Sequence, residues 1–382
     1  MNSLREKIER EIRECGPIPF SRYMELCLYD PELGYYSRNA QQFGKAGDFY
    51  TSSDVHAVFG RLLARQFDEM WRALGSPERI ELVELGPGRG LFAQDVLDWC
   101  EKKFPDFFAA LRYVLVESSP ALRGRIKETL ARHIELGKAE LTAADSLISE
   151  ASSPNSATIV FANEFFDAMP VEVITPQGSL RIDVRAGRFV ESWAATSNEE
   201  FEFLDRYSVH PDAGERVEAS LQAQRLMDRV AASIQRGFFL AIDYGYTREE
   251  QLAGRHRGTV KALRQHSISA DPYEAPGEQD ITADLNFTAL AAAAEKRGMQ
   301  IQRLVTQSQF LMGIGEANQF ADALEECRLP QERAKVALQL KHLVTPAGMG
   351  ESFQVLIASK GVERERAMSL SGLSFGSSPM GR

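Results

Sequence analysis

The 382-residue sequence predicts an α/β fold in which helices flank a mainly parallel sheet. Short apolar segments with the length of buried strands alternate with longer segments of helical periodicity. One apolar segment, in residues 81–90, runs directly into three glycines at alternate positions, which is typical of a buried strand that turns sharply into a helix. Three further apolar segments, at 113–116, 159–162 and 238–242, each end in polar residues. Such polar strand ends are where open α/β sheets place their ligands.

Residues 1–76 are predicted to form an N-terminal helical and lid segment ahead of the first strand. A polar, glycine-rich loop in this segment contains Gly47, Asp48 and Thr51. A plain linker would also have this composition. We favour a lid that folds over a bound cofactor, because polar loops positioned by a rigid sheet often carry function. These three residues are therefore candidate cofactor ligands.

The glycine loop after the first strand indicates the kind of ligand. Glu84 stands two residues before Gly86, and Gly88 and Gly90 follow at alternate positions. Glycine lets a ligand approach the backbone closely. A dinucleotide loop has its third glycine one residue later and holds a pyrophosphate, whereas a carboxylate at the loop suits a cationic ligand without phosphate. A dinucleotide loop and a plain tight turn stay open as alternatives.

The second strand, at 113–116, ends in Glu117, and a helix start signal of serine and proline follows. A carboxylate at this strand end can accept hydrogen bonds from both vicinal hydroxyls of a ribose. Glu117 is therefore predicted to bind ribose, with a solvated glutamate as the alternative.

The fourth strand, at 159–162, is followed by Asn163, Glu164 and Asp167. The simpler alternative makes Asn163 a helix N-cap and Glu164 a favourable charge in the first helical turn. We favour a functional cluster, because capping requires neither paired carboxylates nor the adjacent Phe165 and Phe166. If a helical turn begins there, Glu164 and Asp167 share one face.

The fifth strand, at 238–242, ends in Asp243 and Tyr244, a second polar and aromatic strand end. The core containing these strands is predicted to span residues 77–360. Helical or loop-like insertions are expected at about 195–236, 247–286 and 310–348. The segment after residue 360 is rich in Ser, Gly and Met and is predicted to be a disordered tail, 361–382.

Composition excludes several classes of function. A net charge of −10 and a pI of about 5.3 argue against nucleic-acid or anionic-membrane binding, which need a positive surface. The four cysteines have no C-x-x-C spacing, so neither a disulfide framework nor a zinc site is indicated, and we expect no metal. The first 15 residues carry both signs of charge and no long apolar run, unlike a secretory or mitochondrial leader. We therefore expect a cytoplasmic protein without membrane insertion.

Six segments in order together resemble the MidA-like family, whose mitochondrial members are arginine methyltransferases that assist complex I assembly. The segments are GYY and GDFYTS in 34–52, ELGPGRG at 84–90, NEFFDAMPVEV at 163–173, IDYGY at 242–246, DITADLNF at 280–287 and GESFQVL at 350–356. The resemblance implies a class I methyltransferase fold, a Rossmann-like sheet of seven strands. It also implies S-adenosyl-L-methionine as cofactor and a protein arginine as methyl acceptor, with a respiratory complex I subunit among the candidate partners.

The expected chemistry suggests roles for residues. Gly86, Gly88 and Gly90 would approach the donor, with Glu84 at its amino end, directly or through water. Asp145 follows a short strand, where family members use a carboxylate or an adjacent amide for the adenine amino group, and Asn163 would also line the donor site. Glu164 and Asp167 would hold and deprotonate the guanidinium, while Asp243 and Tyr244 complete that wall.

Three other functions remain open at this stage. A nicotinamide oxidoreductase is disfavoured by the early third glycine and by Glu84. A small-molecule methyltransferase would suit an apolar pocket near Phe165, Phe166 and Tyr244. A non-catalytic assembly factor that binds the donor is disfavoured by the carboxylates. The absence of a mitochondrial targeting segment indicates a bacterial member, which leaves the acceptor, the number of methyl groups added and homo-oligomer formation open.

Overall fold

The computed structural model describes residues 3–38, 57–142, 157–264, 267–269, 271–345 and 349–375. The chain forms two compact units, and each unit is assembled from three separate chain segments. Unit 1 comprises Met1–Phe49, Glu164–Asp228 and Tyr244–Ala293, and unit 2 comprises Tyr50–Asn163, Arg229–Asp243 and Ala294–Arg382.

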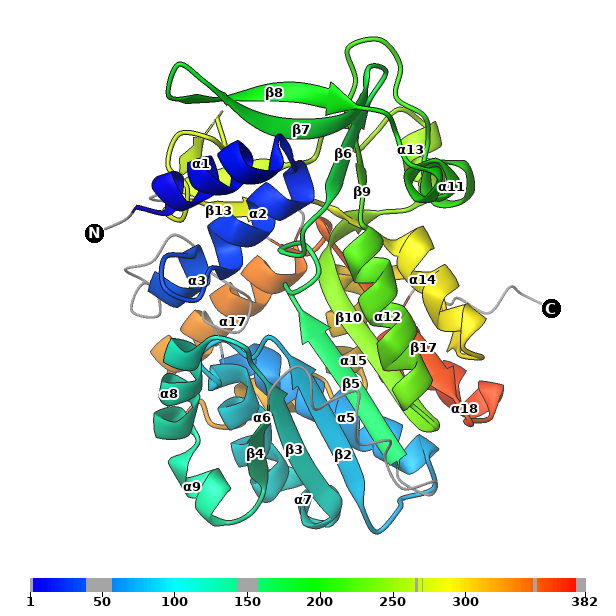
Figure 1. Ribbon diagram of the computed structural model, residues 1–382. Coiled ribbons are helices and arrows are strands. Elements are labelled where there is room, and N and C mark those ends of the chain that lie inside the picture. The colour runs from blue at the N-terminus through cyan, green and yellow to red at the C-terminus, as the bar shows by residue number, and fades with distance from the viewer. Residues whose placement is uncertain are drawn as a thin grey trace, which may run out of the picture. The chain divides into compact units, whose positions relative to one another are not determined.

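Unit 2 is built on a sheet in the order β15-β17-β10-β5-β2-β3-β4 (Figure 1). Its five strands from β10 to β4 are parallel. Two short strands, β14 and β16, pair with β10 and β17, so the hydrogen-bonded sheet of the described residues has nine strands rather than the expected seven. Of these, β14 and the end of β10 from Tyr244 belong to unit 1. The strands are β2 (Ile80–Leu85), β3 (Leu111–Val116), β4 (Ala139–Thr142), β5 (Ala157–Asn163), β10 (Arg236–Tyr246), β14 (Leu285–Asn286), β15 (Gln300–Ile301), β16 (Val305–Thr306) and β17 (Phe353–Lys360).

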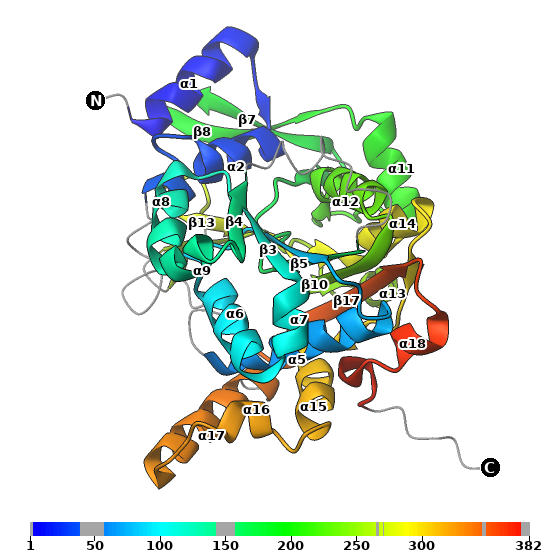
Figure 2. The ribbon, with the colours of Figure 1, turned by 90° about the horizontal axis from the view of Figure 1, so that it is seen from below.

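Helices cover both faces of this sheet, with α5 and α6 on one side and α12 on the other (Figure 2). The central strands are accordingly apolar on both faces, as buried parallel strands are. Phe92 of α6 stacks on Phe161 of β5 with ring centres 4.7 Å apart, and Phe67 of α5 meets the same ring edge-on. These contacts fix the helix that follows the glycine loop against the centre of the sheet.

The helices of unit 2 vary from one turn to four turns in length. They are α5 (Ala57–Ala73), α6 (Leu91–Lys103), α7 (Pro105–Ala110), α8 (Pro120–Thr129), α9 (Ala131–Glu135), α15 (Gln307–Glu316), α16 (Ala321–Leu324), α17 (Pro330–Val344) and α18 (Arg364–Met368), with a 3₁₀ turn at Ser371–Leu373. None of the helices in the described part of the chain is both long and apolar enough to cross a membrane.

Unit 1 contains an antiparallel sheet in the order β1-β7-β6-β9, and β8 pairs with β7. The β7–β8 hairpin turns at Ala186 and Gly187, which both have positive φ, as a two-residue turn between twisted strands requires. The strands are β1 (Ile18–Pro19), β6 (Glu172–Thr175), β7 (Gly178–Arg185), β8 (Arg188–Ala194) and β9 (Val217–Ala219).

Two N-terminal helices share an apolar core with this sheet. Ile8 and Ile12 of α1 and Tyr23 of α2 are buried in one cluster with Leu180 and Ile182 of β7. A capping box of Ser3 and Glu6 begins α1. A second cluster joins α11 to β6 and β9. The helices are α1 (Leu4–Cys15), α2 (Phe20–Tyr29), α3 (Tyr35–Arg38), α11 (Asn198–Tyr207) and α13 (Arg248–Leu252); α12 (Leu221–Ser233) and α14 (Phe287–Lys296) each contribute residues to both units.

A third, three-stranded sheet completes unit 1. It has the order β12-β11-β13, and its strands are β11 (Lys261–Arg264), β12 (Ser267–Ser269) and β13 (Asp280–Thr282). These strands lie in the segment that the sequence predicts to be a loop-like insertion. The antiparallel pairing of β13 with β11 holds Asp280 at a buried position.

The C-terminal segment differs from its expectation. Residues 361–375 were expected to belong to a disordered tail, yet they form α18 and a 3₁₀ turn. Three apolar side chains, Ala367, Leu370 and Leu373, are buried, and Gln66 of α5 accepts a hydrogen bond from the Gly372 amide. Serine and glycine dominate the composition there, but a few well-spaced apolar residues suffice to dock the chain. The predicted boundaries near residues 76 and 360 stay predictions.

Candidate active site

The carboxyl ends of four adjacent strands of unit 2 bring candidate residues to one edge of the sheet. The register pairs Leu85 with Val116 on one side and with Ala162 on the other, so Gly86, Glu117 and Asn163 follow at the same level. Asn163 itself pairs with Ile242, and Asp243 comes next. Four residues predicted from separate segments of sequence therefore share one edge, as parallel strands require.

The glycine loop has the backbone that only glycine adopts easily. Gly86, Gly88 and Gly90 have φ of 65°, 55° and 77°. Among the described residues, a Cβ added to Gly88 would meet no atom within 4 Å, whereas one added to Gly90 would contact Leu130 and Ile126 at 3.4–3.5 Å. Gly88 thus leaves open space beside the backbone, while Gly90 permits close packing at the start of α6. The loop is shaped for a ligand that approaches its backbone.

Glu84 is buried beneath this loop. Its Oε2 accepts a hydrogen bond of 2.8 Å from the hydroxyl of Tyr113, a fully buried residue of β3. Burial raises the pKa of Glu84 to about 8, the charge of Glu117 acts in the same direction, and the Tyr113 hydrogen bond opposes them. Sequence analysis did not identify Tyr113, although a phenol in a buried strand needs a polar partner.

Glu117 is also buried, with 8% of its surface exposed. Its Oε1 accepts a hydrogen bond of 2.8 Å from the Ser119 amide. Burial raises the pKa of Glu117 to about 7, although the backbone hydrogen bonds from Ser119 and Ser118 act to lower it. Arg123 donates to the carbonyls of Glu117 and Thr142 at 3.0 and 2.8 Å, which ties together the ends of β3 and β4.

These groups fit S-adenosyl-L-methionine. The two buried carboxyl groups, Glu84 and Glu117, have pKa values raised towards neutral pH. A ligand that brings positive charge and hydroxyl donors stabilises their ionised form. A phosphate would instead meet like charge. The glycine loop supplies open backbone, and the strand ends supply hydrogen-bond acceptors. Four predicted cofactor residues, Gly47, Asp48, Thr51 and Asp145, lie outside the described residues.

The polar segment after β5 belongs to unit 1 and is not helical. Residues 164–170 form a bend and a turn, in which the Met169 amide donates to the Phe166 carbonyl at 3.1 Å. The expectation that Glu164 and Asp167 share one face of a helical turn is therefore wrong. Glu164 has a φ of 49°, a strained conformation for a residue with a side chain. Such strain is found more often at functional sites than elsewhere.

Asp167 is almost fully buried, with 4% of its surface exposed, and its carbonyl accepts a hydrogen bond of 2.9 Å from the Ala283 amide. That hydrogen bond joins the turn to Ala283, the residue directly after β13. Phe166 is buried next to it, and its ring meets that of Phe165 edge-on, with centres 5.2 Å apart. Only Phe165 of this pair is partly exposed.

An acid and aromatic cluster forms around Asp167 in unit 1. Tyr36 donates to Asp280 Oδ1 at 2.9 Å, and Asp280 is 4% exposed. The Tyr29 hydroxyl donates to the Ala168 carbonyl at 2.9 Å, and its ring lies 5.5 Å from that of Tyr36. Burial raises the pKa of Tyr36 far above its usual value, and Asp280, Tyr29 and Asp167 each raise it further.

Sequence analysis did not identify Tyr36 and Asp280 as site residues. Both lie in segments that carried the family resemblance, GYY and DITADLNF, and that is the signal that could have found them. The predicted residues divide between the two units: Glu84, the glycines, Glu117, Asn163 and Asp243 lie in unit 2, and Glu164, Asp167 and Tyr244 lie in unit 1. Each unit therefore contains its own group of candidate site residues.

Comparison with known proteins gives consistent results. Residues 62–305 match the family model described as "Putative S-adenosyl-L-methionine-dependent methyltransferase". The protein arginine methyltransferase NDUFAF7 homolog, mitochondrial, of Drosophila melanogaster is 32% identical, with 94% of this chain and 85% of the relative covered. The mitochondrial protein arginine methyltransferase NDUFAF7 of Homo sapiens is 30% identical, with 90% and 80% covered.

Solved structures are similar over nearly the whole chain. A Burkholderia thailandensis protein, described as a "likely methyl transferase" and bound to S-adenosyl-homocysteine, superposes with a TM-score of 0.81 at 28% identity, covering 97% of this chain and 94% of that one. A native structure from the same organism gives a TM-score of 0.79 with the same identity and coverage.

Proposed function

Because this chain belongs to the family of S-adenosyl-L-methionine-dependent methyltransferases, we propose that it transfers the donor's methyl group to the guanidinium of an arginine in a protein substrate. The relatives named as protein arginine methyltransferases support this acceptor. The structural observation that carries it is the pair of buried carboxylates, Asp167 and Asp280, beside Tyr36. Buried carboxylates with aromatic neighbours suit a planar cation.

In this proposal unit 2 binds the donor. Gly86 and Gly88 let it approach the backbone, Glu117 accepts hydrogen bonds from the ribose hydroxyls, and Asn163 lines the same strand edge. Glu84 adds negative potential beneath the loop and is held in place by Tyr113. The roles of Asp145, Gly47, Asp48 and Thr51 stay predictions.

Unit 1 binds the acceptor. A guanidinium has a pKa of about 13.8, so it is a poor nucleophile until its charge is localised and a proton is removed. Asp167 and Asp280 hold the guanidinium through charge-assisted hydrogen bonds, and Tyr36 fixes the orientation of Asp280. Glu164 and Tyr244 of unit 1 are further candidates for this role, and the acceptor role predicted for Asp243, which lies in unit 2, stays a prediction. When bound, the donor would supply a sulfonium methyl group: the nitrogen attacks its carbon in line, the S–CH₃ bond breaks to leave S-adenosyl-homocysteine, and the guanidinium proton passes to Asp167 as general base.

A methylation assay with the full-length protein tests the proposed function. The purified protein is incubated with S-adenosyl-L-methionine and a cell extract, and modified residues are located by mass spectrometry. Methylarginine that requires Asp167 supports the proposal. Methylation of small molecules alone would favour a small-molecule methyltransferase, and donor binding without any transfer would favour a non-catalytic assembly factor.

The finer assignments are proposals as well. A subunit of respiratory complex I is our first candidate substrate. The six sequence segments resemble the MidA-like family, whose mitochondrial members are arginine methyltransferases that assist complex I assembly. The curated relatives reported above are named as mitochondrial proteins, whereas we propose a cytoplasmic location for this chain. Recovery of complex I subunits with a donor-bound protein, and fractionation of the source cells, would test the two assignments separately.

A further inference from the structure

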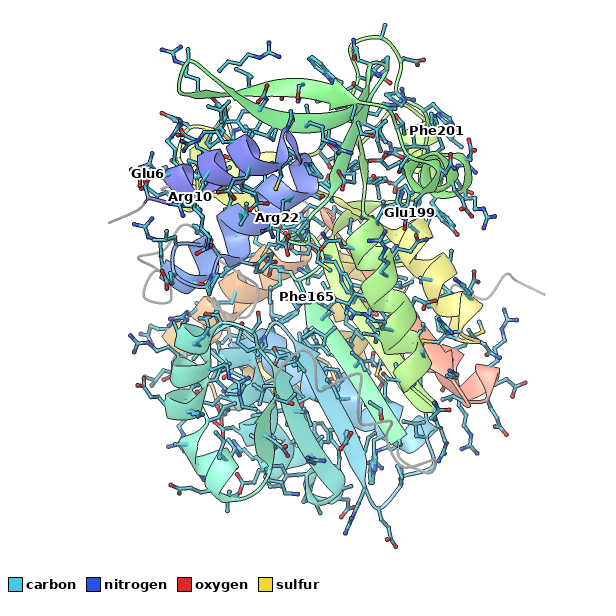
Figure 3. All side chains as sticks on the ribbon, viewed as in Figure 1. Glu6, Arg10, Arg22, Phe165, Glu199 and Phe201 are labelled. Atoms are coloured by element: carbon cyan, nitrogen blue, oxygen red, sulfur yellow. The ribbon has the colours of Figure 1, made fainter. Side chains whose placement is uncertain are left out.

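Unit 1 contains a polar cavity of about 160 Å³ that none of the roles above uses. Its walls come from α2, β6, β7, the first turn of α11 and the first turns of α12. The side chains that matter are those of Ser21, Glu172, Arg181, Ser197, Glu199 and Arg225. Figure 3 labels two side chains of α11, Glu199, which lines the cavity, and Phe201, which does not. A cavity of about 150 Å³ holds a benzene molecule, so a planar guanidinium fits in this one.

Glu172 provides a hydrogen-bond acceptor in the wall. Its Oε1 accepts from the Ser21 hydroxyl, whereas its buried Oε2 accepts no hydrogen bond from any described residue. The nearest cation is the Arg181 guanidinium, whose Nη1 lies 3.5 Å from that oxygen. Burial raises the pKa of Glu172, and a donor placed against Oε2 would offset that cost.

The other two carboxylates of the cavity already have hydrogen-bond or ion-pair partners. Glu199 and Arg225 pair with each other at the exposed rim. Glu200 is buried and accepts from the Ser179 hydroxyl and the Ser197 amide at 2.8 and 2.6 Å. Three carboxylates face two guanidiniums, which leaves one negative charge in excess.

This balance selects the class of ligand. An anion would meet Glu172, and the first turn of α11 is already neutralised by Glu199 and Glu200 and capped by Ser197. A divalent metal ion needs about six oxygen ligands, and one carboxylate oxygen does not supply them. A monovalent cation with several N–H donors satisfies Glu172 and the neighbouring acceptors. Guanidinium and ammonium groups have this chemistry.

We infer that this cavity binds the guanidinium or ammonium of a basic side chain in the protein substrate, with Glu172 Oε2 as its main acceptor. The inference rests on the proposed function, since it makes the cavity a docking site for a substrate residue other than the one methylated. Specificity for a basic residue near the target arginine follows from it.

The test compares two blocked amino acids of similar shape and different charge, N-acetyl-arginine methylamide and N-acetyl-citrulline methylamide. Both are titrated calorimetrically into the full-length protein. Because the arginine probe can also occupy the acceptor site, the titrations use the Asp167→Asn background. We expect the arginine probe to bind at least tenfold more tightly than the citrulline probe. Equal affinities would overturn the inference.

Variants then locate the binding. Glu172→Gln should weaken the arginine probe at least tenfold, whereas Glu202→Gln, a carboxylate change on α11 outside the cavity lining, should alter its affinity less than twofold. Far-UV circular dichroism and a cooperative thermal transition report whether each variant is folded. If Glu172→Gln does not fold, a second variant, Gln222→Phe, is used instead. Its larger side chain fills the cavity from α12 and should also weaken binding of the arginine probe at least tenfold. Tight binding in a folded cavity variant would reject the site.

Two further readouts separate the outcomes. With a protein substrate, Glu172→Gln in an otherwise native chain should raise KM about tenfold and leave kcat unchanged, as expected for binding equal in the ground and transition states. Free L-arginine that binds tenfold more tightly than the blocked probe would assign the cavity to a free amino acid and overturn the docking role. Absence of methylarginine despite Glu172-dependent probe binding would reject the proposed function alone.

Discussion

The two units place their candidate residues by different means. In unit 2, Gly86, Glu117, Asn163 and Asp243 reach one edge because parallel strands in register end together. In unit 1, Tyr36, Asp167 and Asp280 come from three segments far apart in sequence, and no repeated element aligns them. The strand edge of unit 2 that we propose for the donor, the donor edge, follows from one geometric rule and can be predicted from short patterns. The cluster of unit 1 that we propose for the acceptor, the acceptor cluster, depends on tertiary packing.

The largest expected effect tests the acceptor cluster. Asp167→Asn should lower kcat by about 10²–10⁴-fold, the usual range for loss of a positioned general base. Affinity for S-adenosyl-L-methionine, measured by calorimetry, should stay within twofold, because Asp167 belongs to unit 1. Glu164→Gln should likewise lower kcat and leave donor affinity nearly unchanged. Glu202→Gln, on the exposed side of α11, is the control and should change neither. A large loss of donor affinity in Asp167→Asn would contradict the assignment of donor binding to unit 2 and acceptor binding to unit 1.

Glu117→Ala tests the donor edge. Loss of hydrogen bonds to a charged group should weaken donor binding by about 1–3 kcal/mol. The matched variant Glu140→Ala removes an exposed carboxylate on the neighbouring strand β4 and should have little effect. Calorimetric affinity unchanged in Glu117→Ala would remove this residue from the donor site.

The pH dependence of donor binding gives a smaller effect. Burial raises the pKa values of Glu117 and Glu84 to about 7 and about 8, so both carboxyls of the free protein are protonated at low pH. Donor affinity should therefore rise with pH up to about 8. Below pH 7 it should fall by up to about tenfold per pH unit for each of these carboxyl groups that must be ionised to bind the donor. Glu117→Gln should flatten this slope. An equally steep profile in that variant would point to another titrating group.

The smallest effect separates stability from donor binding. Ser3→Ala removes the capping box of α1 and should cost about 1 kcal/mol of unfolding free energy. Because α1 belongs to unit 1, affinity for S-adenosyl-L-methionine should not change. Denaturant unfolding and calorimetry measure the two quantities. A parallel loss of donor affinity would show that the donor edge depends on the packing of α1.

The donor edge was largely predictable from sequence. Residues 81–90 carry the strand, the sharp turn and the helix start in one continuous run, and the structure reproduces them in β2, the glycine loop and α6. The exception is Tyr113, which contacts Glu84 across the strand pair β2–β3. Cross-strand partners depend on register, and the sequence of a single strand does not specify its register.

The acceptor cluster was predicted only in part. Asp167 stood out because it follows a buried strand, but its partners could not be inferred. Asp280 is buried by the pairing of β13 with β11, which lies in a segment rich in His, Arg, Gly and Pro that resembles a loop. The turn at Glu164 was misassigned as helical because the residue spacing suits a helix, while the observed backbone has a positive φ.

The interleaved assembly of unit 1 has a consequence for biosynthesis. As the chain leaves the ribosome, Ile8 and Ile12 of α1 emerge early, but their packing partner Ile182 of β7 is made much later. Until then α1 has only α2 to cover its apolar side, and incompletely buried apolar surface is a condition under which nascent chains recruit chaperones or aggregate. Unit 2 is completed later still, because its segment Ala294–Arg382 is made last. Fragments that end before β7 cannot bury their first helix against that strand.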